Sequence, residues 1–485
     1  MKKQLGLLIG FIILMFFAVT AWVQGQQPQA EEPPEIMQRI AEETSSQQNA
    51  QKTQRKILEI QEVISDNGIK SWLVEDHSLP IIALQFSFKN AGSIQDSVDK
   101  QGLARLLSNT MDEGAGDLDA QEFQKTLSDN SITLYFNSGR DNFGGQLKTL
   151  SRKKEMAFDL LKLALTQPRF DDEPLARMKQ ANISRIKNSK GQPDWIGARL
   201  FNDVSFENHP YALNSGGTIT SLENITKADL KQRHATWLTK EDLVIAVSGN
   251  ITPEELKKAL DDVFGGLPDY APENKISSFS LQNTGNSYLY KKDIPQTLIT
   301  VALPSIAPTD PDYYALRLLN FIYGGGGFGS NLMEEAREKR GLTYGIYSSL
   351  INQDYINYMT ISTSTKNESA GEMMGIIKDE MLKIRDTSIS DQKLIDAKSY
   401  LIGSMPLGLT STDKISSTLL SLQLNKRDIN YLDNLKRNIN KVTIEDLENV
   451  AKRLYNPENF LTMMVGNPAP LETNIIELKD LPNVE

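Results

Sequence analysis

Two hydrophobic periodicities alternate along the chain from residue 57 onward. Apolar and polar residues alternate over 62–75 and again over 79–89, which predicts strands, and Asn67-Gly68 predicts a hairpin turn inside the first run. Apolar residues recur every three or four positions in segments that predict helices at about 100–112, 119–129, 151–167, 173–189 and 195–205. Further strands are predicted at 131–137 and 142–148. This mixture indicates an α+β fold.

The end of the first half carries signals that return later in the chain. Thr226-x-x-Asp229 predicts a helix N-terminus, and Leu243–Ser248 predicts a strand. At a shift of 217 residues the sequence repeats in the pairs Asp76/Asp293, Thr226/Thr443, Asp229/Asp446, Leu230/Leu447, Gly249/Gly466 and Asn250/Asn467. A constant shift predicts two homologous domains. We place them at 57–262 and 285–472, with a linker at 263–284 and a tail at 473–485.

The N-terminus has the pattern of an export signal. Lys2 and Lys3 precede an uncharged run from Leu5 to Val23. We interpret residues 1–25 as a signal peptide, in preference to an uncleaved membrane anchor, and residues 26–56 as a flexible tether rich in Gln, Pro and Glu. The pattern predicts an exported protein of the periplasm or cell envelope, with contact to the membrane only through the N-terminal segment if it is not cleaved.

The composition of the chain excludes several kinds of partner and catalytic group. The chain has 485 residues, a net charge of -10 and no cysteine. An acidic surface does not favour nucleic acid as a partner, and the absence of cysteine excludes disulfides, thiolate nucleophiles and thiolate metal sites. No P-loop, dinucleotide fingerprint or G-x-S-x-G elbow is present.

No metal site is predicted in this chain. The histidines, His77, His209 and His234, are too far apart in sequence for zinc-motif spacing, and we expect each to have a structural or surface role. The acidic residues Asp112, Glu113 and Asp117 offer carboxylate ligands for a hard cation, but such a cluster is more often a solvated surface.

One stretch differs from an ordinary connection between elements. Residues 324–344 read GGGGFGSNLMEEAREKRGLTY. The glycines permit positive φ angles and close approach of other groups, Ser330 is placed as the N-cap of a short charged helix, and Gly341 ends that helix. The alternating residues LTYGIYSSL after it predict a strand.

This stretch closely resembles the second-domain motif of the M16 family of metallopeptidases, which includes pitrilysin, insulinase and the mitochondrial processing peptidase. The resemblance extends over about 57–472. It implies two homologous domains, each an antiparallel sheet with helices packed on it.

The resemblance also implies a zinc site that this chain has lost. Active members carry His-x-x-Glu-His on a helix of the first domain, with two zinc-binding histidines and a glutamate that serves as general base. The corresponding residues here are Arg105, Ser108 and Asn109 in Arg-Leu-Leu-Ser-Asn. A further glutamate is expected between Met178 and Gln192, and that segment contains no acidic residue. The sequence therefore predicts no intrinsic catalytic residues and no bound metal.

The second-domain residues are retained. In the family an arginine and a tyrosine bind the substrate backbone and stabilise the tetrahedral intermediate; the matching residues are Arg337 and Tyr344, beside the glycines Gly324, Gly325, Gly326 and Gly327. The resemblance implies the non-catalytic subunit of a heterodimeric zinc peptidase. The zinc-bearing partner subunit would then cleave unfolded peptides. The alternative is a stand-alone peptide-binding or scaffold protein of the cell envelope.

Overall fold

The computed structural model describes residues 56–471, 474–482 and 484–485. The expectations for the signal segment at 1–25 and for the tether up to residue 55 lie outside the described residues. Residues Ile57–Glu485 form one compact unit. Among the described residues no helix is both long enough and apolar enough to cross a membrane.

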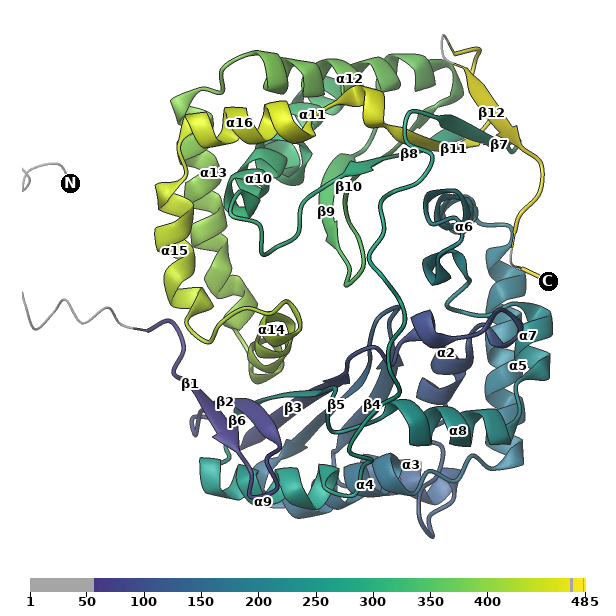
Figure 1. The fold of residues 1–485 in the computed structure, drawn as a ribbon, viewed down its shortest axis with the longest axis vertical. Coiled ribbons are helices and arrows are strands. Elements are labelled where there is room, and N and C mark those ends of the chain that lie inside the picture. The colour runs from purple at the N-terminus through teal and green to yellow at the C-terminus, as the bar shows by residue number, and fades with distance from the viewer. Residues whose placement is uncertain (1–55, 472–473, 483) are drawn as a thin grey trace, which may run out of the picture. The chain divides into compact units, whose positions relative to one another are not determined.

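The first domain is built on a six-stranded sheet in the order β1-β2-β6-β3-β5-β4 (Figure 1). Its strands are β1 (Ile60–Ile64), β2 (Lys70–Glu75), β3 (Ile81–Phe88), β4 (Thr133–Ser138), β5 (Phe143–Leu150) and β6 (Leu243–Gly249). All neighbours are antiparallel except β2 and β6. The predicted hairpin is confirmed: Gly68 has φ 82° in the turn that joins β1 to β2, and Ile64 pairs with Lys70.

The predicted helices of this domain form, and the structure adds two that the sequence analysis did not predict, Ile219–Asn224 and Pro253–Phe264. They are α2 (Leu103–Ser108), α3 (Ala120–Asp129), α4 (Lys154–Thr166), α5 (Asp172–Ser189), α6 (Pro193–Ser205), α7 (Ile219–Asn224), α8 (Lys227–Trp237) and α9 (Pro253–Phe264). α2 is shorter than the predicted 100–112, because Gly102 takes φ 85° at its N-cap and Asn109 ends it. Phe86 of β3 lies in the core between the sheet and the helices, with the Phe264 ring of α9 at 5.7 Å.

The second domain has a sheet with the same arrangement of strands, except that its edge strand comes from the end of the domain instead of from its beginning. Its order is β12-β7-β11-β8-β10-β9. The strands are β7 (Ser287–Lys291), β8 (Gln296–Pro304), β9 (Ile346–Asn352), β10 (Asn357–Lys366), β11 (Leu461–Gly466) and β12 (Ile475–Leu478). The edge strand β12 runs parallel to β7, whereas β1 is antiparallel to β2. The range interpreted as a tail, 473–485, thus contains a strand of the second sheet.

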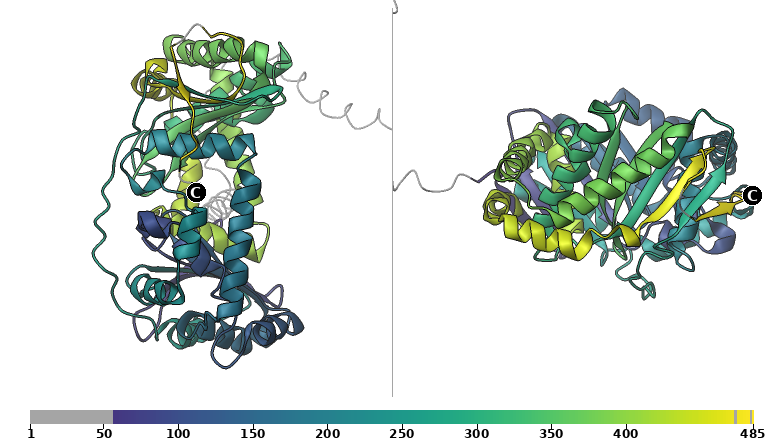
Figure 2. Two further views of the ribbon diagram at one scale, coloured as in Figure 1. Left: turned by 90° about the vertical axis from the view of Figure 1, so that its right-hand side faces the viewer. Right: turned by 90° about the horizontal axis from the view of Figure 1, so that it is seen from above.

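Helices lie over one face of this second sheet (Figure 2, right). They include α10 (Tyr313–Asn320), α11 (Asn331–Met333), α12 (Ala370–Asp386) and α16 (Ile444–Leu454). α13 (Asp391–Ser404) and α15 (Tyr431–Lys441) pack on α10 at the side of this layer (Figure 1). The fold is therefore α+β with two domains of one architecture, as the sequence repeat predicts.

The repeat is visible in local geometry. Thr226 and Thr443 both cap a helix by accepting a hydrogen bond from the backbone N–H of the aspartate three residues later. One sequence pair is corrected. Asp76 donates its backbone N–H to the Gly249 carbonyl, and the residue that does the same to Gly466 is Lys292, not Asp293. The shift is 216 at this strand end, because one residue more separates β7 from β11 than separates β2 from β6.

Each domain also contributes one helix to the other. α6 of the first domain packs on β8 and β11, where Phe201 stands 6.0 Å from the Tyr358 ring. α14 (Thr412–Leu424) of the second domain packs on β3 and β6 (Figure 1). Gln423 of α14 donates to the Ile245 carbonyl at 3.0 Å, and Lys148 forms a 2.5 Å ion pair with Asp413.

Candidate functional site

The three degenerate motif positions lie on α2 and at its end. Arg105 and Ser108 are in the helix, and Asn109 is its C-cap residue, with its backbone N–H 3.1 Å from the Arg105 carbonyl. The buried Ser108 hydroxyl donates to the same carbonyl at 2.8 Å. That hydroxyl is turned back onto its own helix, so Ser108 offers no general base at this position.

α5 supplies a fourth residue, which the sequence does not identify. The buried Asn182 side chain donates to the Asn109 amide oxygen at 3.1 Å, and Arg185 donates to the Asn182 amide oxygen at 3.1 Å. Asn182 falls inside the Met178–Gln192 range where the downstream glutamate is expected. Sequence reasoning identifies only the absence of an acid there, since choosing one position requires knowing how α5 packs on α2.

The side chains around the degenerate motif positions carry positive charge. Burial lowers the pKa of Arg105, and the Arg185 charge lowers it further. The Arg105 Nε–H is buried and has no hydrogen-bond partner. A guanidinium, a hydroxyl and two amides are not zinc ligands, and a fixed cation repels a metal ion. These residues do not fit zinc.

A buried carboxylate that sequence reasoning misses positions α2. Asp96 accepts backbone N–H groups from Gly102 at 3.1 Å and Ala104 at 3.2 Å, and Arg233 lies 3.7 Å away. Burial raises the pKa of Asp96 to about 7, while Arg233 and the backbone donors favour its charged form. The only sequence signal is a lone aspartate shortly before an apolar helix.

The other candidate ligands have structural partners. Within residues 56–471, 474–482 and 484–485, no three His, Cys, Asp or Glu side chains are arranged to hold a metal. Glu113 of the acidic cluster is ion-paired with Arg177 at 2.7 Å. The cluster is not the solvated surface that the sequence predicts, because burial raises the pKa of Asp112 to about 6 and the Glu113 side chain is only 13% exposed.

The histidines are likewise held by neighbours. His77 contacts Glu75 at 2.7 Å, His234 contacts the Leu165 carbonyl at 2.8 Å, and the His209 ring stacks on Phe279 at 3.9 Å. These contacts agree with the structural or surface roles expected for the three residues.

The glycines of 324–344 serve mainly to admit neighbouring groups. Gly324 and Gly325 end a π-helical turn, η5 (Phe321–Gly325). A Cβ on Gly324 would lie 2.7 Å from the Ser348 hydroxyl oxygen, and one on Gly326 would lie 2.7 Å from the Phe321 carbonyl oxygen. Only Gly327, of the run 324–327, takes a positive φ, at 60°. Close approach, rather than left-handed backbone, therefore requires most of these glycines.

The helix after the glycines departs from its prediction. Ser330 occupies the N-cap position, but its hydroxyl donates to the Gly327 carbonyl at 2.7 Å instead of accepting a helix N–H. Only Asn331–Met333 is α-helical, and the next turn, η7 (Glu334–Glu338), is π-helical. Gly341 comes after it with φ 63°, as expected for a residue that ends a helix.

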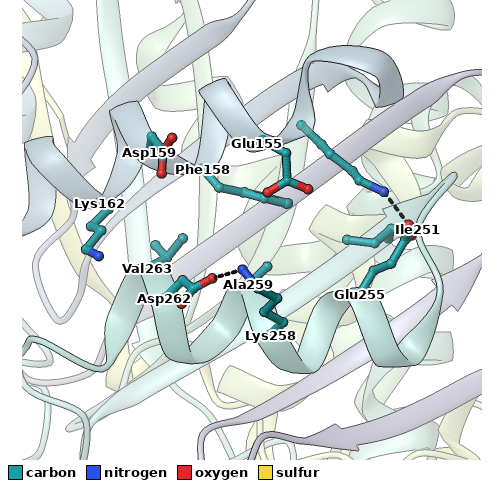
Figure 3. A pocket seen from close by; sticks show the side chains of 11 residues that line it. Glu155, Phe158, Asp159, Lys162, Ile251, Glu255, Lys258, Ala259, Asp262 and Val263 are labelled. Atoms are coloured by element: carbon teal, nitrogen blue, oxygen red, sulfur yellow. Dashed lines mark hydrogen bonds and ion pairs between the residues drawn. The ribbon is translucent and has the colours of Figure 1, made fainter.

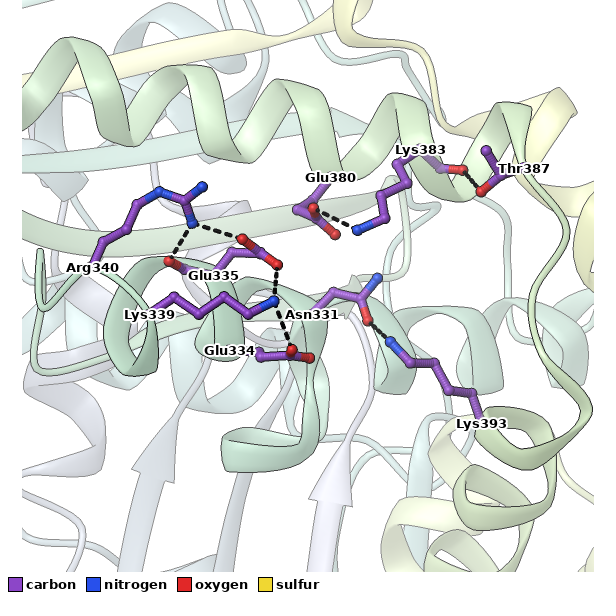
Figure 4. A network of polar contacts seen from close by, with 9 residues as sticks. All are labelled: Asn331, Glu334, Glu335, Lys339, Arg340, Glu380, Lys383, Thr387 and Lys393. Carbon is purple, nitrogen blue, oxygen red and sulfur yellow. Dashed lines mark hydrogen bonds and ion pairs between the residues drawn. The ribbon is translucent and has the colours of Figure 1, made fainter.

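Two of the three cations on this segment are neutralised (Figure 4). Lys339 pairs with Glu334 at 2.8 Å and Glu335 at 2.6 Å, and Arg340 pairs with Glu335 at 2.6 Å. Hydrogen bonds from Arg340 and then Lys339 lower the pKa of Glu335 to about 2. In the described part of the chain Arg337 has no carboxylate partner. Its guanidinium lies 4.6 Å from the centre of the Phe328 ring, which is 63% exposed.

Tyr344 is presented in a bend rather than on a strand. β9 begins only at Ile346, so the strand predicted from residue 342 starts four residues later. The bend is fixed because Gly345 donates its N–H to the Thr343 hydroxyl at 3.0 Å and accepts from the Thr363 hydroxyl at 3.0 Å. Tyr344 is 86% exposed. The segment thus presents an unpaired guanidinium and a phenol to solvent.

Comparison with known proteins identifies relatives of this chain. Residues 82–214 match the family model described as insulinase (peptidase family M16), and residues 224–401 match the model described as peptidase M16 inactive domain; together they cover more than half of the chain. The protein called non-peptidase homolog YmxG of Helicobacter pylori is 26% identical over 384 residues, which are 78% of this chain and 87% of that protein. An uncharacterized zinc protease of Bacillus subtilis is 22% identical over 82% of this chain and 96% of that protein.

Solved structures agree in fold. A crystal structure of a peptidase M16 inactive domain from Pseudomonas fluorescens has a TM-score of 0.79 and 27% identity, covering 86% of this chain and 99% of that chain. A protease from Helicobacter pylori has a TM-score of 0.76 at 17% identity, covering 84% of this chain and all of that chain.

Proposed function

The chain belongs to the peptidase M16 family, and from this premise we propose that it is the non-catalytic subunit of a two-subunit zinc peptidase. In this proposal a partner subunit of the same family holds the zinc and cleaves unfolded peptides. The present chain contributes Arg337 and Tyr344 to binding the peptide and to stabilising the charge that develops on its carbonyl oxygen. No cofactor belongs to this chain.

The lack of intrinsic activity is supported by the α2 site. Arg105, Ser108 and Asn109, which match the motif positions, and Asn182, which contacts Asn109, supply neither a zinc ligand set nor a general base. The relative from Helicobacter pylori is named a non-peptidase homologue, which supports the same assignment here.

The observation that carries the proposal is the electrostatic state of residues 334–344. Their carboxylates neutralise Lys339 and Arg340, yet Arg337 has no acidic partner among the described residues and rests on the exposed Phe328 ring. An unpaired guanidinium has donors free for a peptide carbonyl or an oxyanion, and a phenol adds one more. The neighbouring Lys339 and Arg340, by contrast, have donors occupied by Glu334 and Glu335.

The N-terminal sequence supports the remaining part of the proposal. An exported chain of the periplasm or cell envelope would meet its zinc-bearing partner and unfolded peptides outside the cytoplasm. The alternative, a stand-alone peptide-binding or scaffold protein, uses the same fold but has no particular need for Arg337 and Tyr344, because it stabilises no oxyanion.

The experiment compares the isolated chain with the mixture. The purified chain is dialysed against zinc, analysed for metal and assayed on a fluorogenic unfolded peptide, and the assay is repeated with a co-expressed M16 subunit that has an intact His-x-x-Glu-His motif. We expect no stoichiometric zinc and no cleavage by the chain alone, and faster cleavage by the pair than by the zinc subunit alone. One tightly held zinc per isolated chain, with hydrolysis lost on chelation, would refute the assignment as non-catalytic. Peptide binding by the isolated chain without any effect on the zinc subunit would favour the scaffold alternative.

A further inference from the structure

The two domains differ in the chain that comes after their equivalent central strands. In the first domain β6 leads into α9, which packs against α4 and buries Leu256, Leu260 and Phe264. In the second domain β11 is followed by extended chain and then the edge strand β12, and the described residues after β11 contain no helix. The second domain therefore lacks the counterpart of α9.

The sheet registers fix which residues of α12 correspond to those of α4. Thr149 pairs with Ile82, which faces Gly249, and Thr365 pairs with Thr297, which lies against Gly466. Thr149 and Thr365 are thus equivalent, and the shift is 216. Each is followed by a short 3-10 turn and a long helix, α4 or α12.

With that shift, the surface of α4 that meets α9 maps onto an open groove. Glu155, Phe158, Asp159 and Lys162 line the narrow crevice between α4 and α9, of about 80 Å³ (Figure 3). Their equivalents on α12 are Gly371, Met374, Gly375 and Lys378. All four of these equivalents line a groove of about 690 Å³ in the second domain. The groove occupies the place that α9 fills in the first domain.

The lining of this groove is suited to an apolar helix face. Its apolar side chains include Met374, Phe460, Met464 and Leu471, and Lys378 stands at its rim. Methionine adapts its shape to a packed neighbour more readily than branched side chains do. Ser287, Thr462 and Glu458 also line the groove, so apolar side chains and polar groups of both charges lie side by side, as the two faces of an amphipathic helix require.

α12 has two glycines on the face that lines the groove, and one of them is open to it. Gly371 and Gly375 are four residues apart on one face of the helix, and glycine in a helix interior costs about 1 kcal/mol relative to alanine. Neither has a positive φ; a Cβ on Gly371 would lie 3.4 Å from the Leu471 side chain, whereas one on Gly375 would meet nothing within 4 Å. Internal packing does not require glycine at position 375. The absent side chain leaves room for a neighbouring backbone to approach α12 at this position.

We propose that this groove binds an amphipathic α-helix of about three turns supplied by another polypeptide, in the manner in which α9 covers α4. The helix carries apolar residues at the spacing of Leu256, Ala259, Leu260 and Val263, which α9 buries. The interaction surface goes beyond the proposed peptidase role and does not involve Arg337 or Tyr344.

The test measures binding of a fluorescent peptide to the full chain. The peptide has the sequence of residues 251–266, which include α9. We expect saturable binding with a dissociation constant below about 100 μM. The Gly375→Leu variant, which places a side chain in the groove, should weaken binding at least tenfold. Gly403→Leu is the matched control, since position 403 also lies in a helix with nothing within 4 Å of its added Cβ. It should bind as the unmodified chain does.

A second peptide separates helix docking from general stickiness. It replaces Leu256 and Leu260 by aspartate and should not bind. Equal binding of both peptides, or equal binding to the Gly375→Leu variant, would overturn the proposal, as would the absence of binding by the α9 copy up to about 1 mM. Thermal unfolding of both variants verifies folding, and neither should melt lower than the unmodified chain because each removes a helix glycine.

Discussion

A zinc site can be restored at α2 if the degenerate positions have been assigned correctly. The perturbation is the triple substitution Arg105→His, Asn109→His and Asn182→Glu. The first two place imidazoles one helical turn apart, because the Asn109 N–H still bonds to the Arg105 carbonyl at 3.1 Å. The third brings a carboxylate from α5 toward them.

The geometry can be compared with zinc coordination directly. Ligand atoms bound to tetrahedral zinc at 2.0–2.2 Å lie roughly 3.3 Å apart. The Asn109 and Asn182 side-chain tips are 3.1 Å apart, so the two positions already face each other, and the longer histidine and glutamate side chains reach the ligand spacing by choice of rotamer. The Arg105 substitution also removes a guanidinium whose Nε–H is buried without a partner, so little stability should be lost with it.

The assay is calorimetric titration with zinc and metal analysis after gel filtration. We expect one zinc per chain at micromolar affinity or better, roughly -8 kcal/mol, for the triple variant and none for the unmodified chain. The matched control keeps Asn182 and carries only the two histidines; it should bind at least about tenfold more weakly, a difference of about 1.4 kcal/mol. If the triple variant binds zinc no better than this control, Asn182 does not occupy the ligand position and the assignment is wrong.

Two further predictions concern stability. Burial, and then the charge of Arg140, lowers the pKa of His209 to about 4, so the folded protein favours the neutral ring. The stability that this neutral ring contributes to folding is complete above about pH 6.5 and is lost as the pH falls toward 4. Between pH 7.5 and 5, the free energy of unfolding in urea should therefore fall by about 1–2 kcal/mol less for His209→Phe than for the unmodified chain, an amount limited by solvent screening of the partly exposed ring. The same pH dependence in both proteins would contradict this prediction. Gly249→Ala should destabilise by more than about 1 kcal/mol in the same assay, because φ is 120° and the added Cβ would lie 2.1 Å from a carbonyl oxygen, whereas Gly191→Ala in open space should have little effect. Equal effects of the two alanines would show that the strand end relaxes.

Local sequence signals predict the elements well because each element depends on its own residues. Asn67-Gly68 makes its hairpin, and the capping residues Thr226 and Thr443 begin their helices as expected. The repeat is visible in the sequence because glycines at 249 and 466 meet the same backbone constraint in both domains.

The features that the sequence could not predict depend on packing between distant residues. The exchange of α6 and α14 leaves no mark on periodicity, since a helix that packs on another domain has the same apolar stripe. The alternation predicts Tyr344 on a strand because it continues through that residue, and only the hydrogen bonds of Gly345 show a bend. Asn182 becomes recognisable only through its contact with Asn109.

The substrate-binding role assigned to residues 334–344 is tested most directly by peptide turnover of the reconstituted pair. Arg337→Ala and Tyr344→Phe are compared with Arg340→Ala, which removes an ion-paired cation from the same segment, and with Tyr270→Phe, which alters a tyrosine that is 78% exposed elsewhere. Each of the first two should lower turnover about 100- to 1,000-fold, or 2.7 to 4 kcal/mol, while the complex stays intact by gel filtration and the two controls turn over normally. Normal turnover by both Arg337→Ala and Tyr344→Phe in an intact pair would contradict the account.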